Sequence, residues 1–214
     1  MSGRPLPAGG EGDGEQPVGR LRAFVAVPVP PARALASFLA AAREAMPGFR
    51  WVEPQKLHVT LRFLGYLEQT MVARLVTELS RIRAEPFELG VSGLGKFGGS
   101  GLARVVWLGV GRGAQPLIEL AAQVEDACRL AGLPPSDRQF RAHLTLARAR
   151  DRRGAQLPEL PPVPAVEPWP VREVVLFQSR PGASGANYVP VFSLPLGVAQ
   201  PRTSQRASTA PAKA

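Results

Sequence analysis

Two short segments of the 214-residue chain share one pattern, in which a histidine, an apolar residue, a threonine and a leucine follow one another. The first is His58-Val59-Thr60-Leu61, and the second, 85 residues further on, is His143-Leu144-Thr145-Leu146. They contain the only 2 histidines of the chain. With an ordinary pKa of about 6.5, a histidine can donate or accept a proton near neutral pH, and a threonine hydroxyl can donate a hydrogen bond to an oxygen.

The elements that hold these residues are expected to be strands. Side chains two residues apart in a strand share a face. His58 and Thr60 then point one way while the apolar residues between and after them point the other way, and His143 and Thr145 do the same. If the two strands come together, one cleft floor holds two imidazoles and two hydroxyls.

This set suits phosphoryl chemistry at a cyclic phosphodiester. One imidazole can activate water and the other can protonate the leaving ribose oxygen, while the hydroxyls bind the non-bridging oxygens. A single His-x-Thr strand is usually structural, but both histidines stand in the same frame. Two histidines could also ligate a transition metal, although no third ligand is obviously placed. We therefore expect neither a metal nor a cofactor.

Two arginines are candidates for holding the phosphate, because a guanidinium fork matches its geometry. Arg148 follows His143 by five residues, so strict alternation places it on the opposite face, and it reaches the site only at a strand end or through a bulge. Arg62 shares the face of His58 by alternation, and its alternative role is a charge at the rim.

Three aromatic residues, Phe97, Phe140 and Trp51, could stack on a base, although each is more often part of a core. The glycines around Gly93-Leu94-Gly95 and Gly98-Gly99 do not form a phosphate loop, because neither a Lys-Ser/Thr pair nor a helix follows them. We interpret that stretch as a flexible turn.

Strands and helices alternate along the chain and predict an α+β fold with hairpin-like strand pairs. Strands are expected at 21–27, 56–64, 87–94, 103–110, 142–148, 171–179 and 187–194, with a short extended piece at 50–52. Helices are expected at 32–45, 69–84 and 114–131, and a proline-rich connection at 151–170. Residues 1–20 and 199–214 are predicted to be disordered tails around one domain of two lobes over 21–198.

The composition favours a folded protein with a polyanionic partner. Hydrophobic residues make up 45% of the chain, and the net charge is +9. Because the first tail contributes −1 and the second +3, a charge of +7 falls on residues 21–198; a general arginine-rich composition explains this charge equally well. Cys128 is predicted to be a buried small residue. No segment has the length of a membrane helix or the pattern of a secretory signal, so we expect a cytoplasmic location.

The paired motifs resemble the signature of the 2H phosphoesterase superfamily, and within it the bacterial and archaeal RNA 2′,3′-cyclic phosphodiesterases, historically called 2′-5′ RNA ligases. The likeness covers about residues 21–196. Further segments that resemble this family are Arg22–Val27, Trp51-Val52, Leu61–Gly65, Val105–Val110 and Phe140–Arg148.

The resemblance implies a bilobal, pseudo-symmetric fold with an antiparallel sheet in each lobe, helices outside and the two histidines facing across the cleft. It implies hydrolysis of a 2′,3′-cyclic phosphate to a 2′-phosphate, with His58 as the proton donor and His143 as the proton acceptor. It also places Arg148 at the phosphate. The expected partner is an RNA end or a small cyclic nucleotide, bound by a monomer. Two alternatives stay open: reversible 2′-5′ ligation on the same residues, and a non-catalytic RNA-binding module on this fold.

Overall fold

The computed structural model of the protein describes residues 19–99, 101–158, 162–182 and 185–197. The two predicted tails lie outside these residues, apart from Gly19 and Arg20.

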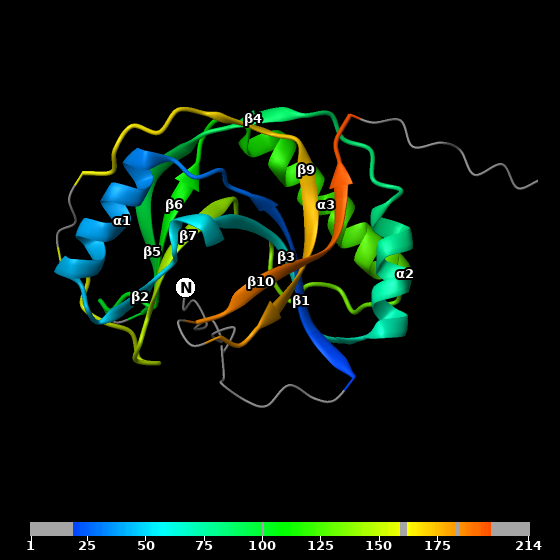
Figure 1. The fold of residues 1–214 in the computed structure, drawn as a ribbon, viewed down its shortest axis with the longest axis horizontal. Coiled ribbons are helices and arrows are strands. Elements are labelled where there is room, and N and C mark those ends of the chain that lie inside the picture. The colour runs from blue at the N-terminus through cyan, green and yellow to red at the C-terminus, as the bar shows by residue number, and fades with distance from the viewer. Residues whose placement is uncertain (1–18, 100, 159–161, 183–184, 198–214) are drawn as a thin grey trace, which may run out of the picture.

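Ten strands and three α-helices follow one another along the described chain (Figure 1). The strands are β1 (Arg20–Pro28), β2 (Phe49–Trp51), β3 (His58–Glu68), β4 (Phe87–Leu89), β5 (Val91–Phe97), β6 (Val105–Val110), β7 (His143–Ala149), β8 (Trp169–Val171), β9 (Glu173–Arg180) and β10 (Asn187–Pro195). The helices are α1 (Arg33–Ala45), α2 (Gln69–Leu79) and α3 (Ala114–Leu130), and a short 3₁₀ turn, η1 (Pro54–Lys56), precedes β3.

The strands form two four-stranded antiparallel sheets and one small two-stranded sheet. The first sheet has the order β10-β9-β1-β3 and the second has the order β2-β7-β6-β5, while β4 pairs with β8. This architecture confirms the α+β class. Each large sheet holds one of the two histidine strands, and each combines strands from distant parts of the chain.

The helices cover the strands from outside. In Figure 1, α1 lies on one side of the molecule and α2 and α3 lie on the other, with the strands between them. Helix α1 packs near β2, whereas α2 and α3 pack together and against β3. The apolar faces of helices and sheets form one continuous core, in which Val59 of β3 and Leu144 of β7 have no exposed surface. The strands that carry the histidines are therefore fixed from behind.

Four boundaries differ from the sequence expectation. Strand β3 continues past Gly65, where φ is +71°. The pairing with β1 is kept because Leu64, which has no partner in β1, forms a bulge beside Gly65. Helix α2 ends at Leu79, although the apolar period continues to the buried Ile82. The single strand expected at 87–94 is split into β4 and β5.

The fourth difference is β8, whose first two residues lie in the connection expected to be irregular at 151–170. Pro170 is its central residue, and it faces Glu88 of β4. Because this sheet has only two strands, each strand has one partner, and a proline can occupy a position that does not donate to it.

Burial predicts a large stability cost at the back of β7. We expect Leu144→Ala to lower the free energy of unfolding by about 2–5 kcal/mol, because it removes a fully buried side chain and leaves a cavity. Denaturant unfolding measures this. The matched control is Leu130→Ala at a leucine that is 72% exposed, where the change should stay within about 0.5 kcal/mol. Equal losses in the two variants would contradict the described core.

Candidate active site

Each histidine strand contains one extra residue directly after its threonine. In the pairing of β1 with β3, Val25 faces Arg62 but Ala26 faces Thr60, so Leu61 has no partner in β1. In the pairing of β6 with β7, Val106 faces Ala147 but Trp107 faces Thr145, so Leu146 has none in β6. Two residues of one strand opposite one of its neighbour define a β-bulge. The two strands thus share a bulge at the same place in the motif.

The bulges change which side chains share a face with the histidines. After an extra residue the alternation shifts by one, so the fifth residue after each histidine joins the face of the histidine. In β7 this residue is Arg148, and the burial of both Leu146 and Ala147 shows the shift directly. In β3 it is Phe63, whose side chain is 62% exposed. Below, this face of β3 and β7 is called the site face.

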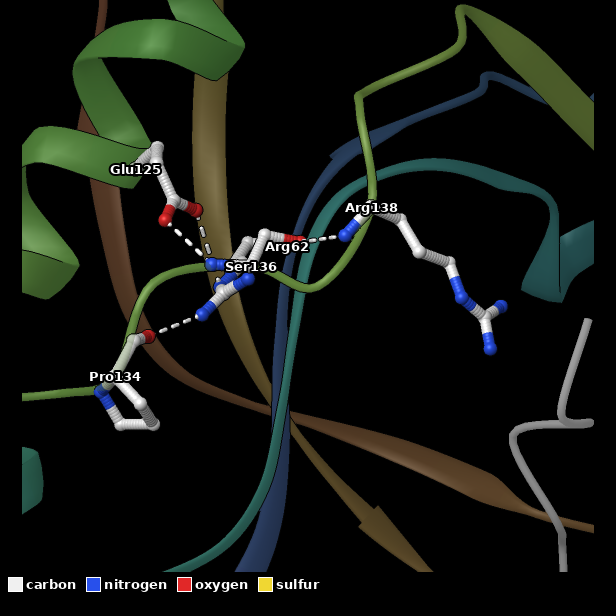
Figure 2. A network of polar contacts seen from close by, with 5 residues as sticks. All are labelled: Arg62, Glu125, Pro134, Ser136 and Arg138. Carbon is white, nitrogen blue, oxygen red and sulfur yellow. Dashed lines mark hydrogen bonds and ion pairs between the residues drawn. The ribbon is translucent and has the colours of Figure 1, made fainter.

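Arg62 is therefore not on the site face, and the prediction that it shares the face of His58 is wrong. Its guanidinium lies against helix α3, where Nε is 3.3 Å from Oε2 of Glu125 (Figure 2). The prediction failed because period-two alternation does not include the bulge at Leu61.

The two histidine strands approach one another although they belong to different sheets. Residues of β3 and β7 lie within contact distance of each other, and the charges of Arg148 and His143 both act on His58. Arg148 acts in the same way on His143. The structure thus brings His58, His143 and Arg148 into one site, with Thr60 and Thr145 following the histidines on the same faces.

Both imidazoles are held by the same backbone contact. Nδ1 of His58 lies 2.8 Å from the carbonyl oxygen of Lys56, and Nδ1 of His143 lies 2.7 Å from that of Arg141. Because a carbonyl oxygen only accepts, each Nδ1 carries a proton and donates it. This arrangement fixes the tautomer, so that Nε2 of each neutral ring carries the lone pair.

Aromatic rings surround each histidine. The ring of His58 lies 4.9 Å from that of Phe24 and 5.0 Å from that of Tyr188. The ring of His143 lies 5.2 Å from Phe97 and 6.1 Å from Trp107, measured between centroids. In each sheet the two aromatic residues come from two other strands, so the environments of the two histidines are similar.

Gly95 explains how Trp107 fits beside His143. A Cβ atom at this position would lie 2.2 Å from the indole ring, so only a glycine lets the ring lie flat across β5. The stretch Gly93-Leu94-Gly95 is consequently strand and not the flexible turn that was expected. Its glycines are part of how the aromatic surroundings of His143 are built.

Burial lowers the pKa of both histidines. The pKa of His58 is lowered to about 4, first by desolvation among the aromatic rings and then by the charge of Arg148 and the coupling to His143, while the hydrogen bond to the Lys56 carbonyl acts in the opposite direction. The pKa of His143 is lowered as well, first by desolvation and then by Arg148 and Arg141, against the hydrogen bond to the Arg141 carbonyl. Without a bound anion, both rings are neutral at physiological pH.

The remaining sequence candidates fall into two groups. Phe97 contacts His143, whereas Trp51 is 5% exposed and belongs to the core, where Nε1 donates to the carbonyl of Met46. Phe140 is partly buried against the core. Cys128 is buried and free, as predicted.

Sequence reasoning missed Phe24, Tyr188, Trp107 and Phe63 as neighbours of the site. Phe24 stands in a run of buried residues, so its sequence context indicates only a core position. One signal was available: Trp107 alternates in its strand with the apolar residues Val106 and Leu108, which places it on the opposite face from them.

The described residues also bear on the binding of a metal ion and on the crossing of a membrane. Among them, no three His, Cys, Asp or Glu side chains gather in a way that could hold a metal ion. None of the helices in the same part of the chain combines the length and the apolar character needed to cross a bilayer.

A two-sheet α+β fold with one His-x-Thr strand in each sheet defines a class of phosphoesterases with two repeated halves. The sequence profile of the family described as LigT like Phosphoesterase matches residues 25–107 and again residues 108–188, and the chain belongs to this family. The match confirms the resemblance that the paired motifs indicated.

Individual relatives agree with the family. The chain is 38% identical over 102 residues to the RNA 2′,3′-cyclic phosphodiesterase of Aeropyrum pernix, covering 48% of this chain and 58% of that protein. It is 30% identical over 142 residues to the protein of that name from Escherichia coli, covering 66% and 77%. The matched region thus spans little more than half the length of several of these relatives.

Solved structures show the same fold. The crystal structure of E. coli LigT complexed with 3′-AMP superposes with a TM-score of 0.68 at 26% identity, covering 84% of this chain and 99% of that one. A Thermus thermophilus protein superposes with a TM-score of 0.62 at 29% identity, covering 82% and 98%. Each superposition covers nearly the whole of the compared structure, so the bilobal arrangement of this family applies to the chain.

The low pKa of His58 predicts a pH-dependent stability. The unfolded chain takes up a proton on this residue near pH 6.5, but the folded protein does so only near pH 4. The free energy of unfolding therefore has its full value, as far as His58 is concerned, above about pH 6.5. It falls as the pH is lowered to about 4, by roughly 3 kcal/mol from His58.

Denaturant unfolding at about pH 7 and about pH 4.5 measures this difference. Carboxylates titrate in the same range, so the comparison is with His58→Gln, which lacks the imidazole and should lose less stability on acidification. The same loss in both proteins would show that His58 is not desolvated in the folded state.

Proposed function

We propose that this protein hydrolyses 2′,3′-cyclic phosphates at RNA ends or in small nucleotides to 2′-phosphates, with His58 and His143 as the acid–base pair. The observation that carries the proposal is the identical anchoring of the two rings. Each donates Nδ1–H to a carbonyl two residues earlier and keeps Nε2 for proton transfer, and Arg148 lies near both. The names of the relatives support the reaction class.

In this mechanism the oxygen of a water molecule attacks the phosphorus while Nε2 of His143 takes a proton from that water. The bond from phosphorus to O3′ breaks, and O3′ receives the proton carried by Nε2 of His58. The phosphate then stays on O2′. The order of the two roles follows the family resemblance, since the contacts of the two rings are alike.

The substrate itself supplies the condition that His58 needs in order to be an acid. In the free protein desolvation and the positive charge of Arg148 keep this ring neutral at pH 7. A phosphodiester carries a negative charge, which offsets that of Arg148 and stabilises a protonated imidazole. His58 therefore takes up its proton together with the substrate.

Thr60, Thr145 and Arg148 bind the non-bridging oxygens in this proposal. Hydroxyl and guanidinium groups donate to the charge that grows on these oxygens in the transition state. Phe63 stands in β3 where Arg148 stands in β7, and its exposed ring offers the nucleobase a stacking surface on the other side of the site. No step requires a metal or a cofactor, and 2′-5′ ligation would be the same displacement on the same residues, with a 5′-hydroxyl in place of water and O3′ again as the leaving group.

Removal of either imidazole tests the mechanism. We expect His58→Ala and His143→Ala each to lower kcat/KM for a 2′,3′-cyclic mononucleotide by about 10²- to 10⁴-fold, the range for loss of a general acid or base. The assay is run with a chelator present and the position of the product phosphate is determined. The wild-type pH profile should be bell-shaped, with limbs that belong to the coupled pair.

Wild-type activity in either histidine variant would overturn the assigned roles. Activity that disappears in the chelator and returns with a divalent ion would overturn the metal-independent mechanism. If the wild-type protein binds RNA in a salt-sensitive way but opens none of the cyclic phosphates, the non-catalytic module is the better description.

The bulge in β7 makes Arg148 a second test. We expect Arg148→Met to weaken kcat/KM by about 10- to 100-fold, because a charge-assisted contact to phosphate contributes roughly 1.5–3 kcal/mol. The matched control is Arg150→Met, two residues further along, where Nε donates to the carbonyl of Pro47 and the side chain is exposed. Equal effects in both variants would show that Arg148 acts only through the overall positive charge.

A further inference from the structure

Arg62 is a mostly buried cation on the side of β3 that faces away from the site. Its side chain is only 11% exposed, and the neighbouring Leu61 packs into the core. A thiol, that of Cys128, lies near enough to interact with it, and burial raises the pKa of this thiol to about 11, so it is neutral. Glu125 is thus the anionic partner of Arg62 in this region of the described chain.

The contacts of Arg62 lead to the segment between α3 and β7 (Figure 2). Nη2 donates to the carbonyl oxygen of Pro134 at 2.7 Å, and Nε lies 3.3 Å from Oε2 of Glu125. The other carboxylate oxygen, Oε1, accepts the backbone N–H of Ser136 at 2.8 Å. Two bridges, one direct and one through Glu125, therefore fasten this segment to β3.

The fastened segment leads directly to the second histidine. It continues through Arg141, whose carbonyl holds Nδ1 of His143. On the other side, Arg62 lies two residues after Thr60 and four after His58 in the same strand. The Arg62–Glu125 bridge thus joins the strand of one imidazole to the segment that positions the other, across two sheets that share no strand pairing.

Stability alone is a weak explanation for such a bridge. Removing a charged pair from water costs free energy that its attraction only partly returns, and well-packed apolar residues are often as stable at such positions. The hydrogen bonds from Arg62 Nη2 to Pro134 and from Ser136 to Glu125 do fix this segment relative to β3, with the contact between Nε and Oε2 acting as an ion pair. Small displacements of reacting groups are costly for catalysis.

We infer that Arg62 is a positioning residue, which with Glu125 sets the placement of His143 relative to His58. It touches neither the proposed phosphate position nor a histidine, so it acts on the rate through the two strands that it joins. This inference rests on the proposed function for its kinetic consequence, but its structural consequence can be measured without any substrate.

The experiment compares Arg62→Met with the wild type at a temperature where circular dichroism shows both to be folded. We expect kcat for a 2′,3′-cyclic mononucleotide to fall about 10- to 100-fold, with KM changed less than about threefold. In the free protein, NMR titration should show the His58 pKa rising from about 4, because a displaced β7 weakens the coulombic effect of Arg148 and His143, while desolvation, the largest cause of the low pKa, remains.

Two further variants keep the test decisive. Glu125→Gln has the shape of the wild type and keeps an oxygen for Ser136, but it removes the charge, so it should show the same changes in a weaker form. It also replaces Arg62→Met if that variant fails to fold. The control is Arg20→Met. This change breaks an exposed ion pair of 2.9 Å between Arg20 of β1 and Glu68, which lies in β3 like Arg62, and it does not touch the segment before β7. It should leave kcat and the His58 titration unchanged.

The outcomes separate cleanly. A lower melting temperature with wild-type kcat and an unchanged His58 titration in Arg62→Met and Glu125→Gln would overturn the inference and make the bridge purely structural. Equal changes in Arg20→Met would overturn it as well. A wild-type protein without turnover would refute the proposed function, and the His58 titration of the variants would still decide whether the bridge positions the two strands.

Discussion

The site depends on one local constraint, the extra residue that follows the threonine in each histidine strand. A regular strand would present the histidine, the threonine and the residue four places after the histidine on one face. With the bulge, the residue five places after it takes that position, and Arg148 joins His143 and Thr145. The same irregularity in β3 turns Arg62 to the back and Phe63 to the front. One inserted residue in each strand thus determines the chemistry of both faces.

Desolvation is the second property on which the site depends, and the aromatic residues around the two histidines are its cause. Rings from neighbouring strands exclude water around both imidazoles, and this lowers their pKa values. Exclusion of water also strengthens every charge interaction with a bound anion. A site of this kind remains uncharged at its histidines until a phosphate arrives, and the binding of the anion and the uptake of the proton then support each other.

The sequence was sufficient for the parts of the structure that follow simple periods. The alternation around His58–Leu61 and His143–Leu146, the helical spacing in α1 and α3, and the burial of Cys128 all agree with expectation. It was not sufficient where a single position departs from the period. Arg62 was placed on the wrong face, Gly95 was taken for a turn residue, and β8 was hidden by Pro170. Each error concerns a contact between distant segments, which no local pattern contains.

The strand order has a consequence for the evolution and the folding of the molecule. The two sequence repeats, 25–107 and 108–188, do not correspond to the two sheets. Strands β9 and β10 complete the sheet that β1 and β3 begin, and β2 of the first repeat forms the edge beside β7 of the second. A polypeptide holding only one repeat would leave open edges in both sheets. The halves of this protein are therefore interleaved, and each of the two large sheets is built from strands of both halves.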